Sequence, residues 1–203
     1  MSFESPVLLR GSDLACRRGG RRVFAGVSLH LGAGEALWLR GPNGCGKTSL
    51  LRLLAGLSRP SEGRVDAPAG PPAYLGHANA LKDELSVAEA LRFLCSLHGP
   101  RPDDRQLAAA LDAIGLGRRL AFPVRKLSQG QRRKLALARL GLGPARVWLL
   151  DEPYDALDQD GVAWLDERLQ AHRAAGGAVV LTSHQAVALA GLHSLELGAG
   201  GTA

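Results

Sequence analysis

The segment Gly41–Ser49 reads Gly-Pro-Asn-Gly-Cys-Gly-Lys-Thr-Ser, and it decides the fold class. It matches the pattern G-x-x-x-x-G-K-[ST] of a phosphate-binding loop. The alternating stretch Ala36–Arg40 before it predicts a strand. The leucines of Leu50–Leu57 after it predict a helix with one broad apolar face that ends near Gly56. Strand, glycine loop and helix in this order are the context that the motif requires, which disfavours an ordinary glycine turn.

The residue types of this loop suit a nucleotide and its metal ion. Glycines let backbone N–H groups curl around phosphate, and the start of a helix adds partial positive charge. Lys47 would reach the β- and γ-phosphates as a point charge, and the Thr48 hydroxyl would ligate Mg²⁺. We therefore expect ATP and Mg²⁺ as cofactors. The nucleotide contacts expected from the loop are Gly41, Pro42, Asn43, Gly44, Cys45, Gly46, Lys47, Thr48 and Ser49.

Cys45 has two interpretations. The helix-terminal amides and the neighbouring Lys47 would lower its thiol pKa and make it reactive. Alternatively, it is a small buried side chain. The sequence alone leaves both open.

Val147–Leu150 is an apolar stretch that predicts a buried strand, and Asp151 and Glu152 follow it directly. Ligands bind at the carboxyl ends of strands in sheets of this kind. Asp151 is placed to hold Mg²⁺ through water, and Glu152 to orient or deprotonate the attacking water. Alone, the pair could be a solvated strand end, but a phosphate-binding loop in the same chain favours the catalytic interpretation.

The rest of the chain alternates predicted strands and helices, which implies an α/β fold with a mostly parallel sheet. We expect a single domain over residues 1–203, with a helical lobe at about residues 78–142 inserted in the α/β core. The further predicted elements are a strand at Val27–Leu31, a strand at Ala73–Gly76, helices from Ser86 to about His98, Asp103–Ile114 and from Ser128 to about Leu142, a helix at about Gly161–Ala175, a strand at Ala178–Thr182 and a short helix after it.

Composition excludes several classes of protein. The 203 residues are 46% hydrophobic and 22% charged, which is ordinary for a soluble globular protein and excludes disordered, collagen-like and disulfide-scaffold chains. Cys16, Cys45 and Cys95 are odd in number and widely spaced, which argues against a disulfide framework or a zinc site and favours a reducing compartment. The net charge of +6 would suit anionic lipid headgroups, nucleic acid or nucleotides, or it is simply a solvated surface.

Neither a secretory signal nor a membrane-spanning segment is predicted. Met1–Arg10 lacks a basic start followed by a long apolar block, so we expect the protein to stay in the cytosol. Ala174–Leu195 carries no Asp, Glu, Lys or Arg, but its centre, Thr182–Gln185, is polar, and spanning needs about 18 mostly apolar residues. We interpret it as a strand, a polar turn and a short helix. Any membrane attachment would then come through a partner.

Leu127–Gln131 reads Leu-Ser-Gln-Gly-Gln and closely resembles the LSGGQ signature of the ABC-transporter ATPases. A capped helix start with an adjacent glycine is also a second anion site on physical grounds. Tyr154–Asp158 resembles the D-loop of that family, and His184 after Val179–Ser183 resembles its switch histidine. The resemblance covers nearly the whole chain.

The resemblance implies a P-loop NTPase core with an N-terminal antiparallel β portion and an inserted helical lobe, the ABC ATPase fold. It implies ATP hydrolysis with Glu152 and His184 as catalytic residues. It also implies a head-to-tail dimer around two ATP molecules, in which the signature of one subunit faces the nucleotide of the other. The residues so assigned to nucleotide binding are Ser128, Gly130, Gln131 and Asp158.

Two positions depart from the family pattern. Where the family carries a glutamine that links Mg²⁺ to the transporter interface, this chain has His77, whose ring nitrogen can still serve as a ligand. Where an aromatic residue stacks on adenine, the alignment falls on Arg17 or Arg18, so the base would rest on a guanidinium plane or on Phe24.

Within that family the chain resembles the ATPase subunit of the haem exporter of c-type cytochrome maturation, in Gly76-His77, Asp151–Asp158 and Thr182–Gln185 among other stretches. This implies integral membrane transporter subunits as partners, a peripheral position on the cytoplasmic face of the cell membrane, and no nucleic acid partner. Three alternatives stay open: the ATPase of another exporter, a soluble ABC ATPase acting on ribosomes or DNA, and a P-loop small-molecule kinase.

Overall fold

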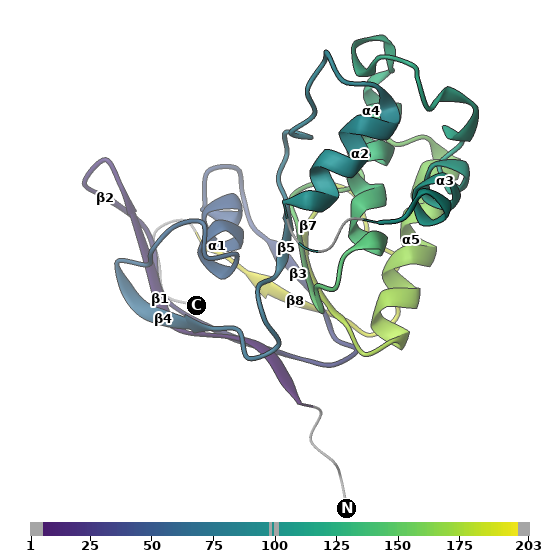
Figure 1. Cartoon of the computed structure of the whole chain (residues 1–203). Helices are drawn as coiled ribbons and strands as arrows, with labels where there is room; N and C mark the ends of the chain where they lie inside the picture. The colour runs from purple at the N-terminus through teal and green to yellow at the C-terminus, as the bar shows by residue number, and fades with distance from the viewer. Residues whose placement is uncertain (1–5, 98, 100–101, 199–203) are drawn as a thin grey trace, which may run out of the picture. The chain divides into compact units, whose positions relative to one another are not determined.

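The computed structural model describes residues 6–97, 99 and 102–198. The chain divides into two compact units (Figure 1). The first comprises the chain up to Gly76, Ala145–Glu152, and the chain from Gln170 onward; the second comprises His77–Pro144 and Pro153–Leu169.

The first unit contains two sheets. An antiparallel sheet has the order β2-β1-β4, and a parallel sheet has the order β5-β6-β7-β3-β8. These sheets confirm the predicted α/β class, with its mostly parallel core and antiparallel β portion. The strands are β1 (Val7–Arg18), β2 (Arg21–Gly32), β3 (Ala36–Arg40), β4 (Glu62–Asp66), β5 (Ala73–Leu75), β6 (Val147–Leu150), β7 (Ala178–Thr182) and β8 (Leu192–Glu196).

Helix α1 (Lys47–Leu54) follows β3 and contacts β1, β6 and β7. Its leucines at positions 50, 51, 53 and 54 are all buried, as the apolar periodicity predicts. Leu57 was expected on the same face, but it is 63% exposed, because the helix has already ended at Leu54.

The expectation of a short helix after Thr182 is wrong. Residues 183–191 form no helix, and the chain then enters β8, which pairs in parallel with β3. Pairing with a neighbouring strand satisfies the backbone groups that a helix would have satisfied internally. Within the described part of the chain, no helix has both the length and the apolar character needed to cross a membrane.

The second unit is helical. It contains α2 (Val87–Ser96), α3 (Asp104–Ala113), α4 (Gln129–Ala138) and the first part of α5 (Gln159–Ala174), with short 3₁₀ turns η1 (Gly117–Arg119), η2 (Val124–Lys126) and η3 (Arg139–Leu142). The helix expected to reach Leu142 is thus α4 followed by η3. The expected end of α2 at His98 lies outside the described residues.

Capping boxes fix where the helices of this unit begin. Those at Ser86 with Glu89 and at Ser128 with Gln131 are confirmed. A third, at Asp103 with Gln106, starts α3. Each box satisfies two backbone N–H groups that a helix start leaves without partners.

In the first unit, Trp148 of β6 stacks on His172 near the end of α5. The ring centroids are 3.7 Å apart with 10° between the planes, and His172 Nε2 lies 3.2 Å from the carbonyl oxygen of Arg146. The imidazole leaves no room for a side chain at position 177, where the chain has glycine. Burial lowers the pKa of His172, partly opposed by its hydrogen bonds to the Arg146 and Ala178 backbone.

This pKa shift predicts a pH dependence of stability. Because the folded state binds the His172 proton less readily than the unfolded state, stability is unaffected above the unfolded pKa of about 6.5 and is lost as the pH falls below it. We expect His172→Gln to cost about 1 kcal/mol at neutral pH through loss of the stack and to flatten the decline at lower pH. Urea titrations between about pH 5 and 8 measure both effects, with the exposed His30→Gln as control. An unchanged pH slope in His172→Gln would contradict the assignment.

Candidate functional site

The phosphate loop depends on its glycines. Gly41, Gly44 and Gly46 have φ of 134°, 81° and 108°, values that glycine adopts without strain. A Cβ on Gly46 would lie 2.7 Å from side-chain atoms of Val23 and Phe24. The loop therefore has a conformation that other residues would adopt only with strain at positions 41, 44 and 46.

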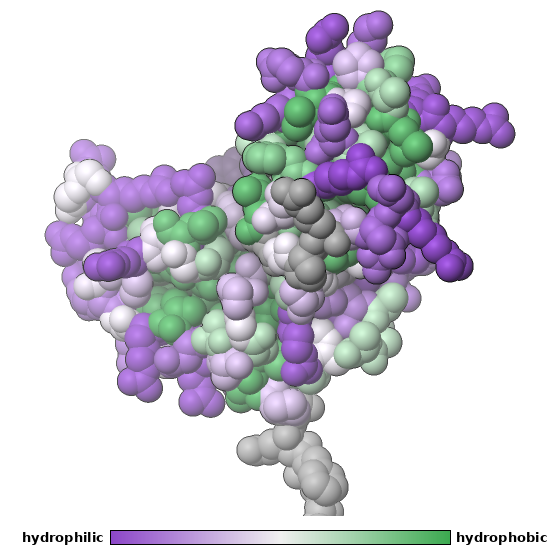
Figure 2. Space-filling view, viewed as in Figure 1, coloured by the Kyte–Doolittle hydropathy of each residue, from purple (hydrophilic) through white to green (hydrophobic). Residues whose placement is uncertain are grey.

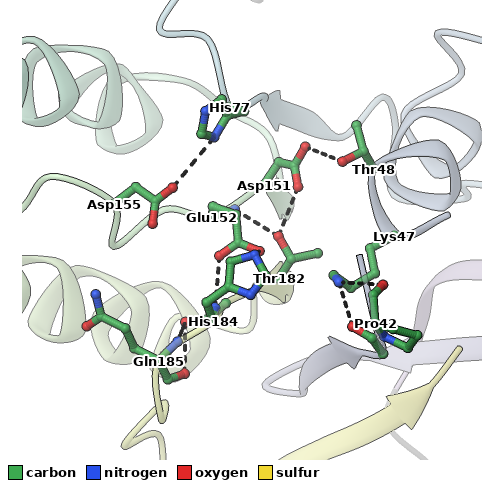
Figure 3. Close-up of polar contacts among 12 residues, drawn as sticks. Pro42, Lys47, Thr48, His77, Asp151, Glu152, Asp155, Thr182, His184 and Gln185 are labelled. Atoms are coloured by element: carbon green, nitrogen blue, oxygen red, sulfur yellow. Dashed lines mark hydrogen bonds and ion pairs between the residues drawn. The ribbon is translucent and has the colours of Figure 1, made fainter. Parts of the chain in front are cut away.

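The start of α1 offers an anion site. Its N-cap residue, Gly46, supplies no side-chain cap, and no acidic residue lies in the first turn. Lys47 Nζ donates to the carbonyl oxygens of Gly41 at 2.7 Å and Pro42 at 3.2 Å (Figure 3). The ammonium group thus lies across the loop, beside helix N–H groups that have positive partial charge.

The burial of two side chains in this region contradicts what was expected of them. Phe24 is 1% exposed, so it offers no face to a base. Cys45 is 3% exposed and packs in the apolar core of the unit, which contradicts the accessible reactive thiol and supports its other interpretation. Arg17 and Arg18 are exposed beside the β1–β2 turn and stay the predicted base contacts.

Asp151 is buried at the end of β6 and is not a solvated strand end. Its carboxylate accepts the Thr48 hydroxyl at 2.8 Å and the Thr182 hydroxyl at 2.9 Å, as Figure 3 shows. Its backbone N–H donates to the Leu75 carbonyl at 2.8 Å. Three other segments of the first unit therefore contact Asp151: α1 and β7 at its carboxylate, and β5 at its backbone.

Glu152 adopts a left-handed backbone conformation, with φ of 49°, and it is 9% exposed. Its N–H donates to Thr182 Oγ1 at 2.8 Å, and its carboxylate accepts the His184 N–H at 3.0 Å. His184 Nε2 lies 3.5 Å from the other carboxylate oxygen (Figure 3). A glutamate in a strained backbone conformation, fixed by two hydrogen bonds, suits a group whose position matters for chemistry.

The paired oxygens of Thr48 and Asp151 fit a magnesium ion. Hydroxyl and carboxylate oxygens are the ligands that this cation prefers, with substrate phosphates completing its coordination. In the described residues no cluster of three or more His, Cys, Asp or Glu side chains could hold a metal ion. The protein thus offers a partial oxygen site of the kind that a nucleotide phosphate completes.

The signature segment begins α4 in the second unit. Ser128 Oγ accepts the Gln131 N–H at 3.2 Å, which leaves the hydroxyl proton for donation to an anion. A Cβ on Gly130 would lie 2.6 Å from the Ala156 carbonyl oxygen. Glycine is therefore required where the signature packs against the Tyr154–Asp158 segment.

Asp158 and His77 have partners in the same unit. Asp158 pairs with Lys134 Nζ at 2.7 Å and accepts the Gly161 N–H at 2.8 Å, and these contacts lower its pKa. His77 Nδ1 lies 3.6 Å from Asp155 Oδ2. Both side chains are largely exposed.

Sequence reasoning missed two residues that organise these segments. Thr182 links Asp151 to the Glu152 backbone in the first unit. In the second unit, the buried Arg133 of α4 donates to the carbonyls of Pro153 and His77 and to Asn79 Oδ1. The sequence held one signal for each residue. Thr182 is a polar residue at the end of an apolar strand, and Arg133 is a charged residue on the face of α4 that is buried.

Residues 24–155 match the family model for the ABC transporter. The chain belongs to the ABC transporter family. It is an ATPase of that family, and nucleotide binding is a property of the matched domain. The matched residues include the phosphate loop, the signature segment, Asp151 and Glu152.

Curated relatives of this ABC ATPase match it over most of its length. It is 48% identical over 91% of each chain to the "Cytochrome c biogenesis ATP-binding export protein CcmA" of Paramagnetospirillum magneticum. It is 46% identical to the protein of the same name from Pseudomonas syringae, over 94% of this chain and 95% of that one.

A solved structure described as the ATP-binding subunit of an ABC transporter matches with a TM-score of 0.80. It is 26% identical and covers 87% of this chain and 79% of that one. The fold expected from the sequence is therefore the fold of this family.

Proposed function

We propose that this ABC ATPase is the ATP-hydrolysing subunit of a membrane export system for cytochrome c biogenesis, in which the transported species is haem or a haem-linked group. The observation that carries the proposal is the similarity, over nine-tenths or more of the chain, to proteins named for that role. The resemblance to the haem-exporter subunits in Gly76-His77, Asp151–Asp158 and Thr182–Gln185 agrees with this similarity.

The residues of the first unit support a hydrolytic mechanism. Lys47 would hold the β- and γ-phosphates of ATP. Bound Mg²⁺ would neutralise charge on those phosphates, and Thr48 and Asp151 are the residues that would hold it, with His77 as a further candidate ligand. Glu152 would take a proton from the attacking water, while His184 would contact the γ-phosphate. Thr182 would keep Glu152 in position, because its hydroxyl oxygen accepts the backbone N–H of Glu152.

We further propose that two chains assemble head to tail around two ATP molecules. The chain has one phosphate loop and one signature, and the two lie in different compact units. In the dimer, Ser128, Gly130, Gln131 and Asp158 of one chain would complete the site formed by Gly41–Ser49 of the other. The monomer would then hydrolyse ATP slowly. Together the two units would form one ABC ATP-binding domain with a helical lobe.

The proposed partners are integral membrane subunits, which would hold the chain at the cytoplasmic face of the cell membrane. A soluble ABC ATPase acting on ribosomes or DNA is the main alternative. Those proteins usually have tandem sites or long coiled-coil insertions, and this sequence shows neither. We therefore propose no nucleic acid partner.

Co-purification from membranes tests the proposal. A tagged chain, solubilised in mild detergent, should retain integral membrane proteins of the cytochrome c biogenesis system, with Glu152→Gln used to lengthen the life of the ATP-bound complex. Retention of membrane proteins of an unrelated exporter would instead favour a role as the ATPase of another exporter. Retention of ribosomes or DNA, in a manner that falls with salt, would contradict a transport role.

A further inference from the structure

The segment that joins α3 to α4 carries four cations, Arg118, Arg119, Arg125 and Lys126, which we call the basic cluster. All four side chains are exposed, and residues 113–127 contain no Asp or Glu. The segment runs along the upper edge of the helical unit in Figure 1. Figure 2 shows hydrophilic side chains at this edge, with hydrophobic ones between them.

The four side chains of the basic cluster form no ion pair within the described part of the protein, although the Asp83 carbonyl oxygen accepts the Arg125 N–H at 3.3 Å. Other cations of the same unit do pair: Arg92 with Asp104, Arg132 with Asp83 and Lys134 with Asp158. The cluster therefore keeps its positive charge available for an external anion.

Backbone hydrogen bonds hold this segment in place. The N–H groups of Val87 and Ala88, at the start of α2, donate to the carbonyl oxygens of Phe122 at 3.0 Å and Leu120 at 3.1 Å. The Val124 N–H donates to the Leu85 carbonyl at 2.9 Å. Since the backbone is already ordered, binding at the cluster has less conformational entropy to lose.

The same segment carries apolar side chains. Leu120 is 41% exposed, one of the three large hydrophobic side chains recorded as exposed among the described residues. Arg119 and Lys126 lie over the half-buried ring of Phe122, with Arg119 Cζ at 5.3 Å and Lys126 Nζ at 5.8 Å from its centroid. Cations in the same segment as an exposed leucine and an aromatic ring are typical of surfaces that meet the headgroup region of a bilayer.

We propose that the basic cluster and Leu120 bind the anionic headgroups of a membrane surface. Guanidinium and ammonium groups attract headgroup phosphates, and Leu120 enters the apolar layer beneath them. An acidic protein segment or RNA would meet the same charges, but RNA has no apolar layer to receive Leu120, and a protein segment would need an apolar residue opposite it. The inference rests on the proposed function, which places the chain beside a membrane, and it adds a lipid contact to attachment through partner subunits.

Sedimentation with vesicles tests this contact on the full chain. The probes are vesicles of phosphatidylcholine alone and vesicles with about a third phosphatidylglycerol. We expect binding only to the anionic vesicles, weakening between about 0.05 M and about 0.5 M salt. Replacing all four cluster cations by Gln should weaken binding by at least about tenfold. Leu120→Ser should weaken it without a change in charge.

A matched variant separates the cluster from net charge. Arg10, Arg21, Arg59 and Arg168 are exposed and lie outside the cluster. Replacing these four by Gln removes the same charge and should leave most of the binding. Equal losses in the two quadruple variants, or no binding of the wild type to anionic vesicles, would overturn the proposal. So would binding of RNA or polyglutamate without binding of these vesicles. Because the assay contains neither ATP nor a membrane protein, such a failure leaves the proposed ATPase role intact.

Discussion

Lys47→Ala is expected to abolish nucleotide binding while leaving the fold intact. Among the described residues, the hydrogen bonds recorded for Lys47 Nζ are to carbonyl oxygens of its own loop, those of Gly41 and Pro42. Its removal therefore costs about 1 kcal/mol of stability or less. The loss to binding is far larger, because no other lysine lies in the loop to meet the phosphates.

Thermal unfolding with and without MgATP measures this difference. At a nucleotide concentration about a hundred times the dissociation constant, binding stabilises the wild type by about 2.7 kcal/mol, and Lys47→Ala should show no shift. Lys82→Ala, which removes an exposed lysine of the helical unit, should keep the full shift. A shift that survives in Lys47→Ala would refute the assigned role of this residue.

The elements predicted correctly from the sequence are those with strong local patterns. The glycine loop and the two capping boxes are set by neighbouring residues, and β6 and β7 are short apolar runs buried on both faces. The strands missed have no such pattern. β4 is almost wholly exposed, and the alternation of β1 is broken by register shifts against β2. β8 is mostly exposed and pairs with the edge of the sheet at β3, a contact between distant segments that no local pattern announces.

The site shows the same division between local and distant contacts. The phosphate loop and the two carboxylates after β6 could be predicted because each lies within one short segment. Thr182 could not, because its role depends on Asp151, 31 residues away in the sequence. The same holds for Arg133, whose contact with the His77 carbonyl spans 56 residues. The residues proposed for the chemistry could therefore be predicted from motifs, whereas the residues that hold them in position could be identified only from the structure.

Glu152→Gln should retain ATP and lose most turnover. The amide has the shape of the carboxylate, and its oxygen can still accept the His184 N–H that the carboxylate accepts at 3.0 Å. The hydrogen bond to Thr182 comes from the backbone N–H of residue 152, which the substitution does not change. The left-handed backbone conformation of residue 152 should therefore be kept. What the amide cannot do is take a proton from water. Loss of a general base typically lowers the rate by about 10² to 10⁴-fold.

Because hydrolysis is what would separate the proposed dimer, the variant should also accumulate as a dimer with trapped nucleotide. Size-exclusion chromatography with MgATP measures assembly, and phosphate release measures turnover. Glu167→Gln, an exposed glutamate of α5, makes the same chemical change elsewhere and should behave as wild type. If Glu152→Gln hydrolyses at the wild-type rate and stays monomeric with ATP, neither the catalytic role of Glu152 nor the head-to-tail dimer can stand. If turnover falls in a monomer, Glu152 keeps its role, and the active site must then be completed within one chain.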